Sequence, residues 1–254
     1  MDRLDNTLVK RNLISSRTRA IYEIKNGNVL VNDKVIVKPS KIVKDEDNII
    51  IKNKLNYVSK GALKLVKAID KFNIILKNKV LLDIGSSTGG FTDVALRNDI
   101  KKVIAVDVGK DQFNEKLKED KRVELYEQTD IRSFTPKDKV DIVTIDISFI
   151  SVLKIIDKLK EISPCEILLL IKPQFECGKE ISDKYKGIPL DKSVHYNVIN
   201  NIINSFNKEG FYIQNLTYSP IRGGSGNIEY LGYFSKEKTK EIDINGVIKK
   251  AFKN

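Results

Sequence analysis

An aspartate and a lysine stand directly after two predicted strands, where charged side chains could do chemistry. Asp146 follows the apolar run 142–145, and Lys172 follows the run 167–171. Because the carboxyl ends of parallel strands share one edge of a sheet, we expect the two side chains to meet there. An ammonium group that loses water needs an acidic partner or a lowered pKa. Asp146 can supply the partner, and Lys64, on the helix before the sheet, would lower the pKa of Lys172.

A partly neutral lysine at this edge could act as a general base for a weakly acidic group such as a ribose hydroxyl. The alternative is a structural Lys–Asp pair that closes the edge of the sheet. Glu229, which precedes the run Tyr230-Leu231, is a further charged residue at the end of a predicted element. The sequence therefore offers two acids and two lysines as candidates for proton transfer.

A turn of small residues follows the apolar strand predicted for 80–84. It reads Gly-Ser-Ser-Thr-Gly-Gly over 85–90, and Ser87 or Thr88 could cap the helix predicted for 91–98. Small residues let a ligand reach the main chain, and the first turn of a helix offers free N–H groups. A turn of this kind at the carboxyl end of a strand is typical of nucleotide-like ligand sites.

The loop fits S-adenosyl-L-methionine better than a nucleotide with phosphates. Two serines follow Gly85 where a dinucleotide site needs Ser-Gly, and Phe91 stands where a phosphate-binding loop has lysine. Asp83 can attract the ammonium group of this cofactor. Asp107, at the tip of the strand predicted for 103–107, is placed to accept hydrogen bonds from ribose hydroxyls. Such loops and acids occur in many α/β proteins, but the two features together favour this cofactor.

Composition narrows the class of protein. With 254 residues, 41% of them hydrophobic, the chain can form one large domain or a main domain with a small appendage. A net charge of +11 and a pI of about 9.4 favour a polyanionic partner, although lysine is abundant throughout. Two cysteines and one histidine argue against a disulfide framework and a zinc site. No apolar run could span a bilayer and no signal peptide is visible, so we expect a cytoplasmic protein with no membrane partner and no metal.

Strands and helices alternate from residue 79 onward. Strands are predicted at 80–84, 103–107, 123–127, 141–145, 167–171, 212–218 and 230–234, and helices at 91–98, 111–119, 150–161 and 193–208. This order indicates a Rossmann-like, doubly wound, mostly parallel α/β sheet over residues 79–254. Residues 55–78 form a linker and a lysine-bearing helix from Tyr57 to Phe72. The tail from Lys236 alternates charges and is expected to be peripheral.

The first 54 residues predict a separate small α+β unit. Its order, with Arg3-Leu4-Asp5, Ser16–Ala20, Gly27-Asn28-Val29 and Val31-Asn32, resembles the RNA-binding module named after ribosomal protein S-four. In that family the second helix lays arginines along the RNA backbone, where they pair with phosphates and release counterions. The resemblance implies RNA contacts for basic residues, here Arg3, Lys10, Arg11, Arg17, Arg19 and Lys25, with Lys60 in the linker. A solvated basic face is the alternative for any one of them.

Motifs along nearly the whole chain resemble one family of methyltransferases. Lys64, Asp146, Lys172 and Glu229 match in order the Lys-Asp-Lys-Glu tetrad of the FtsJ-type ribose 2′-O-methyltransferases. The full set of motifs looks like the TlyA (haemolysin A) family in particular: Tyr57–Gly61, Asp83–Asp93, Asp107–Gly109, Asp146–Ser151, Lys172–Glu176 and Ser219–Gly223. The chain departs from that family at Lys60, Ala62 and Asp130, where Arg, Gly and Asn are usual.

The resemblance implies methyl transfer from S-adenosyl-L-methionine to a ribose 2′-hydroxyl of ribosomal RNA or of a ribosomal subunit. On this interpretation Lys172 activates the hydroxyl, Asp146 and Lys64 orient it and balance charge, and Glu229 positions Lys64 or Lys172. Alignment of the hydroxyl with the methyl group would supply much of the rate.

The resemblance also implies where the cofactor and substrate lie. The cofactor would contact Asp83, Gly85, Ser87, Gly89, Gly90 and Asp107, with Asp130 at its adenine end. Gln174, Phe175 and Glu176 would shape the substrate pocket. The departure at Asp130 leaves its adenine contact open.

Two other functions compete with this interpretation. A membrane-active haemolysin is suggested by the family's historical name, but it would need an amphipathic or spanning segment and an export signal. An RNA-binding ribosome-assembly factor could retain the fold without catalysis. The oligomeric state is open, with a monomer favoured.

Overall fold

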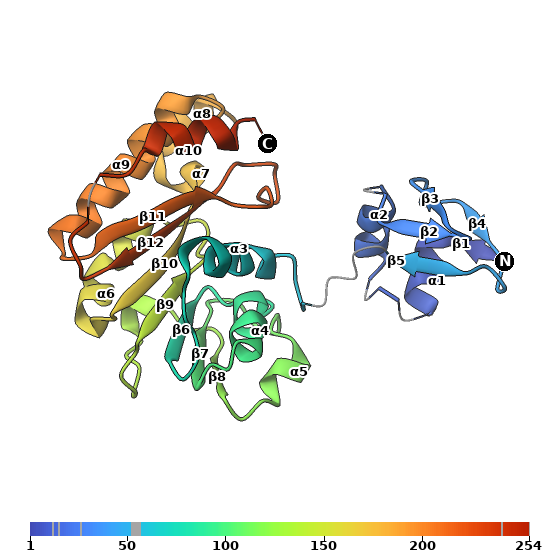
Figure 1. The fold of residues 1–254 in the computed structure, drawn as a ribbon, viewed down its shortest axis with the longest axis horizontal. Coiled ribbons are helices and arrows are strands. Elements are labelled where there is room, and N and C mark those ends of the chain that lie inside the picture. The colour runs from blue at the N-terminus through green and yellow to red at the C-terminus, as the bar shows by residue number, and fades with distance from the viewer. Residues whose placement is uncertain (12, 15, 26, 52–56, 240, 254) are drawn as a thin grey trace. The chain divides into compact units, whose positions relative to one another are not determined.

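The chain forms two compact units, Met1–Asn56 and Tyr57–Asn254 (Figure 1). The computed structural model describes all residues except 12, 15, 26, 52–56, 240 and 254. The side chain of Arg19 is also outside the described part. The lysine-bearing helix α3 (Ala62–Phe72) is part of the second unit, where it packs on helix α4 and strand β12. The helix that the sequence analysis set apart with the linker therefore belongs to the larger core.

The first unit is a small α+β fold, as predicted. Its elements are helices α1 (Leu4–Lys10) and α2 (Arg17–Lys25), the antiparallel sheet β3-β2-β5 (Lys34–Ile36, Val29–Val31, Ile49–Ile51) and the pair β1-β4 (Asp2–Arg3, Ile42–Val43). Leu4 and Leu8 of α1 pack with Ala20 and Ile24 of α2 in a core that also includes Val29. The spacing of these apolar residues on the two helices is what aligns both with the sheet.

The second unit is built on one large, mostly parallel sheet. In the described part of the chain its strands lie in the order β11-β12-β10-β9-β6-β7-β8. Their bounds are Val80–Ile84 (β6), Lys102–Val106 (β7), Val123–Tyr126 (β8), Ile142–Ile145 (β9), Glu166–Ile171 (β10), Tyr212–Tyr218 (β11) and Tyr230–Ser235 (β12). Strands β6 to β10 pair in parallel, and β11 and β12 extend the sheet antiparallel. The predicted α/β class and strand positions are confirmed, with ends that differ by a residue at most.

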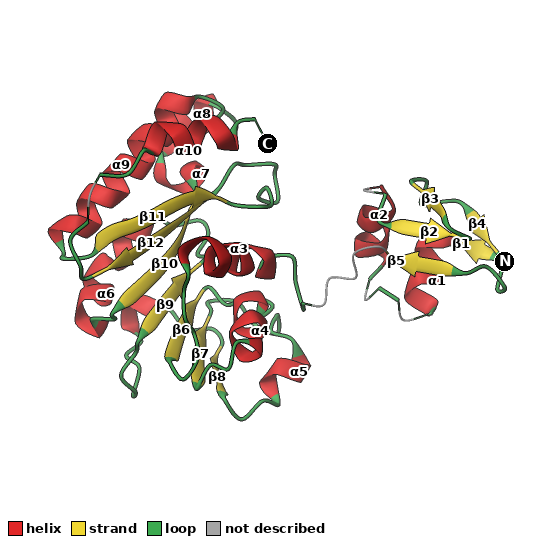
Figure 2. Cartoon of the chain, in the orientation of Figure 1, coloured by secondary structure: helices red, strands yellow, loops and turns green. Residues whose placement is uncertain are grey.

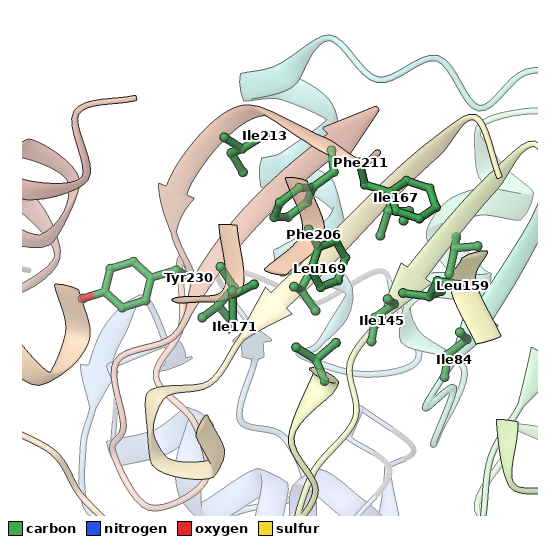
Figure 3. Packing of buried hydrophobic residues seen from close by; sticks show 14 of the residues in the cluster. Ile84, Ile145, Leu159, Ile167, Leu169, Ile171, Phe206, Phe211, Ile213 and Tyr230 are labelled. Carbon is green, nitrogen blue, oxygen red and sulfur yellow. The ribbon is translucent and has the colours of Figure 1, made fainter. Parts of the chain in front are cut away.

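Alternation along the strands divides the core between the two faces of the sheet. In β10, Ile167, Leu169 and Ile171 belong to one buried cluster, whereas Leu168 and Leu170 belong to the other. Figure 3 shows part of the first cluster, in which the β10 side chains lie among Phe206, Phe211 and others. Successive strand residues point to opposite faces, so a parallel strand that is covered on both sides reads as a continuous apolar run.

Helices cover both faces of this sheet (Figure 2). One cluster includes α3, α4 (Gly90–Arg97) and α5 (Glu115–Lys118). The other includes η2 (Val152–Ile155), α6 (Ile156–Ile162), α9 (Lys192–Lys208) and α10 (Ile244–Ala251). The short elements η1 (Ile131–Ser133), α7 (Pro173–Glu176) and α8 (Lys179–Lys184) follow β8 and β10. Among the described residues, no helix has the length and apolar character that crossing a membrane requires.

Three predicted helices differ from those observed. The helix predicted for 111–119 is reduced to α5, because Asp111 has a positive φ of 55° and Asn114 caps the helix by accepting a hydrogen bond from the backbone N–H of Lys116. The helix predicted from Tyr57 begins only at Ala62. The segment predicted as one helix over 150–161 starts as the 3₁₀ helix η2 and continues as α6.

The expectation of a peripheral carboxyl-terminal tail was wrong. Helix α10 packs on α9 and β11 and buries Ile244, Ile248 and Ala251 in the main cluster. Only one narrow stripe of α10 faces the core, so charged residues occupy the rest of its surface. The prediction considered the charges alone and overlooked the apolar residues at helical spacing.

Replacing Ile248 by alanine should lower the free energy of unfolding by about 2–4 kcal/mol, because Ile248 is buried and its loss leaves a cavity. Urea unfolding of the full chain, followed by circular dichroism, measures this cost. The neighbouring exposed Lys249→Ala is the matched control and should change the value by less than about 0.5 kcal/mol. Equal, small effects at both positions would mean that α10 does not contribute to the core.

Candidate active site

Four charged side chains form one continuous chain of ion pairs at the carboxyl edge of the sheet. Lys172 Nζ lies 2.6 Å from Asp146 Oδ1, and Lys64 Nζ lies 3.3 Å from Asp146 Oδ2. Lys64 Nζ also lies 3.0 Å from Glu229 Oε2. The structure thus brings together all four predicted tetrad residues, with Asp146 between the two ammonium groups.

Strand register and side-chain alternation explain this convergence. Leu169 of β10 pairs with Ile145 of β9, and Ile171 of β10 pairs with Tyr230 of β12. Asp146, Lys172 and Glu229 therefore extend the three strands at the same edge. The neighbouring strand residues Ile145, Ile171 and Tyr230 belong to the cluster on the α9 side of the sheet. Successive side chains alternate between faces, so Asp146, Lys172 and Glu229 point to the other side, where α3 carries Lys64.

Burial makes the tetrad a strongly coupled set of charges. Lys64, Lys172 and Glu229 are only 8%, 6% and 4% exposed. Burial opposes the charge of Lys64, but the carboxylates of Asp146 and Glu229 more than offset it and raise the pKa of Lys64 above its ordinary value. Lys64 therefore stays an ammonium at neutral pH.

Two residues that the sequence analysis did not single out also contact the tetrad. Ser148 Oγ accepts a hydrogen bond of 2.9 Å from Lys172 Nζ. A Cβ atom at Gly223 would lie 2.7 Å from Glu229 Oε1, so the loop before β12 approaches Glu229 more closely than any side chain allows. A polar residue two positions after a strand-end acid is the signal that could have identified Ser148.

The glycine turn lies against the tetrad. Gly85 has a φ of 79°, and a Cβ atom there would lie 2.7 Å from the carbonyl oxygen of Asp146. Helix α4 begins after Gly89, which has a φ of 85°, and no described side chain caps it. The predicted cap by Ser87 or Thr88 was therefore wrong: the turn to α4 is made by left-handed glycine instead, which leaves its first N–H groups without a side-chain acceptor.

Two adjoining cavities border this turn. The larger has a volume of about 530 Å³ and is lined by residues that include Asp107, Asp130, Ile131 and Phe149. The smaller has a volume of about 190 Å³ and includes Asp83 and Gly90 in its lining. Gly85, Ser87 and Asp146 line both. All seven predicted cofactor residues but Gly89 therefore line one cavity or the other, and Asp146 is the one tetrad residue that lines both.

The acids of these cavities already have partners within the protein. Asp107 accepts hydrogen bonds from the backbone N–H groups of Ser87 (2.7 Å) and Gly109 (2.6 Å). Asp130 caps η1 and is paired with Arg132 at 2.6 Å, which holds the pKa of its carboxyl below the usual range. The predicted ligand contacts of both acids stay predictions.

Asp83 lies deeper than the other two acids. It is 1% exposed, and the hydroxyls of Thr92 and Thr144 each donate a hydrogen bond of 2.8 Å to it. Burial raises the pKa of Asp83 to about 6, because the two hydroxyls offset only part of the cost of removing a charge from water. Its position at the smaller cavity is compatible with the predicted contact to an ammonium group.

Glu176 ties the loop after Asp146 to helix α7. It accepts hydrogen bonds from Ser151 Oγ (2.6 Å) and from the backbone N–H of Val152 (2.8 Å). Phe175 lies 5.3 Å, between ring centroids, from Phe149, whose side chain is 88% exposed. Of the three predicted pocket residues, Gln174 donates a hydrogen bond to Glu229 and the Phe175 ring lies 5.9 Å from Lys172 Nζ, whereas Glu176 contacts the loop after Asp146.

The predicted RNA-contacting residues differ in what they touch. Arg3 and Arg17 both pair with Asp5, and Lys10 pairs with Asp2 at 2.6 Å. Arg11 donates to the backbone carbonyls of Lys44, Asp45 and Asp47, so its guanidinium holds a turn of the small unit. Lys25 is exposed, Lys60 is half-buried just before α3, and the side chain of Arg19 lies outside the described residues.

Comparison with known families agrees with this arrangement. The model of the FtsJ-like methyltransferases matches residues 57–236, and the model of the S4 domain matches residues 2–49. This chain belongs to the FtsJ-like methyltransferase family. The S4 domain occupies the small first unit, and the tetrad and both cavities lie within the methyltransferase match. The family predicted from the sequence is confirmed.

Relatives of similar length share both parts. The chain is 35% identical to the 23S rRNA (cytidine-2′-O)-methyltransferase TlyA of Campylobacter jejuni, over 90% of this chain and 97% of that protein. It is 41% identical to Hemolysin A of Brachyspira hyodysenteriae, over 91% and 99%. A solved structure described as a hemolysin from Streptococcus thermophilus is 37% identical, with a TM-score of 0.76 over 99% of this chain and 96% of that one.

The close approach at Gly85 can be tested against a matched glycine. Gly85→Ala should destabilise the protein more than Gly210→Ala, because Gly210 has the same φ of 79° but no neighbouring atom within 4 Å. We expect about 1 kcal/mol for the backbone strain at Gly210 and about 1–3 kcal/mol more at Gly85. Urea unfolding of both variants gives the difference, and equal costs would contradict the close packing of the turn against Asp146.

Proposed function

We propose that this protein transfers a methyl group from S-adenosyl-L-methionine to a ribose 2′-hydroxyl of ribosomal RNA. The observation that carries the proposal is the chain of ion pairs Lys172–Asp146–Lys64–Glu229, whose Asp146 lines two cavities. A structural ion pair at a sheet edge would need neither the second pair nor the cavities. The name of the Campylobacter relative, which specifies a cytidine 2′-hydroxyl, supports cytidine as the acceptor nucleoside.

The residues around the two cavities suit this cofactor. The larger cavity has the size and largely apolar walls of a small-molecule site, with Asp107 available for ribose hydroxyls. The smaller cavity offers the Asp83 carboxylate to an ammonium group and the uncapped start of α4 to a carboxylate. When bound, the cofactor would supply a methyl group on a positively charged sulfur. Because Asp146 lines both cavities, a cofactor that occupies them would hold its methyl group near the tetrad.

Lys172 is the residue that we assign to the acceptor hydroxyl. For this role Lys172 must be in its neutral amine form: Nζ would then accept a hydrogen bond from the hydroxyl, orient an oxygen lone pair toward the methyl group and take up the hydroxyl proton. The new oxygen–carbon bond would form as the carbon–sulfur bond of the cofactor breaks. Ser148 and Asp146 hold Nζ in place. Lys64, itself held by Glu229, would keep the Asp146 carboxylate oriented and balance its charge. The protein would thus contribute mainly alignment and a water-poor electrostatic environment.

The small unit and the net charge supply the RNA-binding part of the proposal. An S4 domain with exposed Arg17 and Lys25 can pair with phosphates regardless of base sequence, and the net charge of +11 strengthens such contacts. The larger unit, which contains the tetrad, would then bind the target nucleotide. An enzyme that methylates ribosomal RNA would act where ribosomes are, which supports the expected cytoplasmic location.

Lys172→Ala should reduce methyl transfer to ribosomal RNA at least about 100-fold, because it removes the group assigned to the hydroxyl. Affinities for S-adenosyl-L-methionine and for RNA should change less than about twofold. Transfer of a radiolabelled methyl group, together with calorimetric titration of the cofactor, measures all three. Lys179→Ala, an exposed lysine on α8, is the control and should leave the rate unchanged.

Two results would favour the competing functions. Full transfer by Lys172→Ala would remove the tetrad from the mechanism. No binding of the cofactor by the intact protein, together with tight RNA binding, would favour an assembly factor, and leakage of lipid vesicles by the purified protein would favour a haemolysin.

The affinity for S-adenosyl-L-methionine should rise between about pH 5 and about pH 7. Asp83 has a pKa of about 6, so its carboxyl is mostly neutral at the lower pH and charged at the higher pH, where it attracts the ammonium group. Because the ligand binds the charged form, the increase should approach about tenfold per pH unit below the pKa. Calorimetric titration at several pH values tests this, and Asp83→Asn should flatten the dependence. A flat profile for the unaltered protein would contradict the role of Asp83.

A further inference from the structure

In the first unit, one buried carboxylate binds two arginine side chains from separate elements. Asp5 Oδ1 accepts a hydrogen bond from Arg3 Nε (3.0 Å), and Asp5 Oδ2 accepts from Arg3 Nη2 (2.9 Å) and Arg17 Nε (3.2 Å). The backbone N–H of Asn6 donates to Oδ1 at 3.1 Å. The Asp5 carboxylate therefore links β1 and α2 at the start of α1, while its backbone N–H donates to the carbonyl oxygen of Pro39.

The two guanidinium groups are accessible although their shared partner is not. The side chain of Asp5 is 0% exposed, whereas those of Arg3 and Arg17 are 42% and 56% exposed. Within the described residues neither guanidinium has a second carboxylate partner. The bonds to Asp5 use two nitrogens of Arg3 and one of Arg17, so terminal N–H groups on both side chains remain available to a ligand.

The charge of this cluster fits one phosphate group. Two guanidinium groups and one carboxylate leave a single positive charge, which one RNA phosphodiester would neutralise. Arginine forks bind phosphate oxygens through paired N–H groups, and fixing the forks in advance lowers the entropy that binding must lose. Lys10 and Arg11 in the same unit differ from this pair: Lys10 is 73% exposed on a flexible stem, and Arg11 is tied to backbone carbonyls.

We propose that Arg3 and Arg17 form one binding site for a backbone phosphate of RNA and that Asp5 is its positioning residue. This inference rests on the proposed function, because it takes RNA as the ligand of the small unit. Asp5 acts through the two arginines and does not touch the phosphate. An acidic residue would thus strengthen the binding of a polyanion.

The direction in which the RNA affinity changes when the Asp5 charge is removed distinguishes a positioning role from general electrostatics. Removing a negative charge from a basic RNA-binding protein ordinarily strengthens binding, because the net positive charge rises. If Asp5 positions the arginines, removing its charge should weaken binding instead. A purely structural role for Asp5 would lower thermal stability and leave the RNA affinity of the folded protein unchanged or higher.

Asp5→Asn in the full chain tests the inference, with a ribosomal RNA fragment as the probe. We expect the dissociation constant at fixed salt to rise about tenfold, and the slope of its logarithm against the logarithm of salt concentration to fall by about 1. In the methyl-transfer assay KM for RNA should rise while kcat is retained. Asp33→Asn removes the same charge from an exposed turn of the same unit, at a φ of 63° that asparagine tolerates, and should leave affinity unchanged or slightly higher.

Arg17→Lys provides a second test if Asp5→Asn does not fold. Its side chain is exposed, the charge is kept, and only the fork that pairs with Asp5 and phosphate is lost. We expect affinity to fall several-fold, with an unchanged circular dichroism spectrum. Unaltered or tighter RNA binding by folded Asp5→Asn, or by Arg17→Lys, would overturn the inference. Absence of salt-dependent RNA binding by the unaltered protein would instead contradict the proposed function.

Discussion

The carboxylate of Asp146 lies between two lysine ammonium groups, and the organisation of the larger unit depends on this shared contact. A single acid at the end of β9 fixes Lys172 from β10 and Lys64 from α3, and Lys64 in turn fixes Glu229 before β12. Removing Asp146 would take away the carboxylate paired with Lys172, and removing Lys64 would take away the ammonium paired with Glu229, so either change would leave a buried charge without its ion-pair partner. Asp146 also restricts the residue type in the glycine turn, because its carbonyl oxygen leaves no room for a side chain at Gly85.

Each unit uses one acid to place two cations. In the larger unit, Asp146 holds two lysines at a cavity junction, where one of them can meet a hydroxyl group. In the smaller unit, Asp5 holds two arginines at the surface, where their forks can meet a phosphate. The difference in cation suits the task, since lysine can give up or accept a proton, whereas arginine stays charged and binds oxyanions through paired N–H groups.

The strand positions and the meeting of Asp146 with Lys172 could be predicted, because apolar runs mark buried parallel strands and their carboxyl ends share an edge. The contacts of Ser148, Glu176 and Asp5 could not, since each depends on a partner brought near by tertiary packing. Helix α10 was missed because its narrow apolar stripe is hidden among charges, and the start of α4 was assigned a hydroxyl cap where the chain uses Gly89. Local composition predicts elements well when both faces of a strand are buried and poorly where a turn or cap can be made in several ways.

The most direct test of the central claim is the chemical position of the transferred methyl group. Ribosomal RNA lacking this modification is incubated with the protein and S-adenosyl-L-methionine, digested to nucleosides and analysed by mass spectrometry. The arrangement of Lys172, Asp146, Lys64 and Glu229 predicts a 2′-O-methylated nucleoside, and a substrate with a 2′-deoxy sugar at that position should receive no methyl group. Methylation of a base, or no transfer to any RNA, would contradict the account.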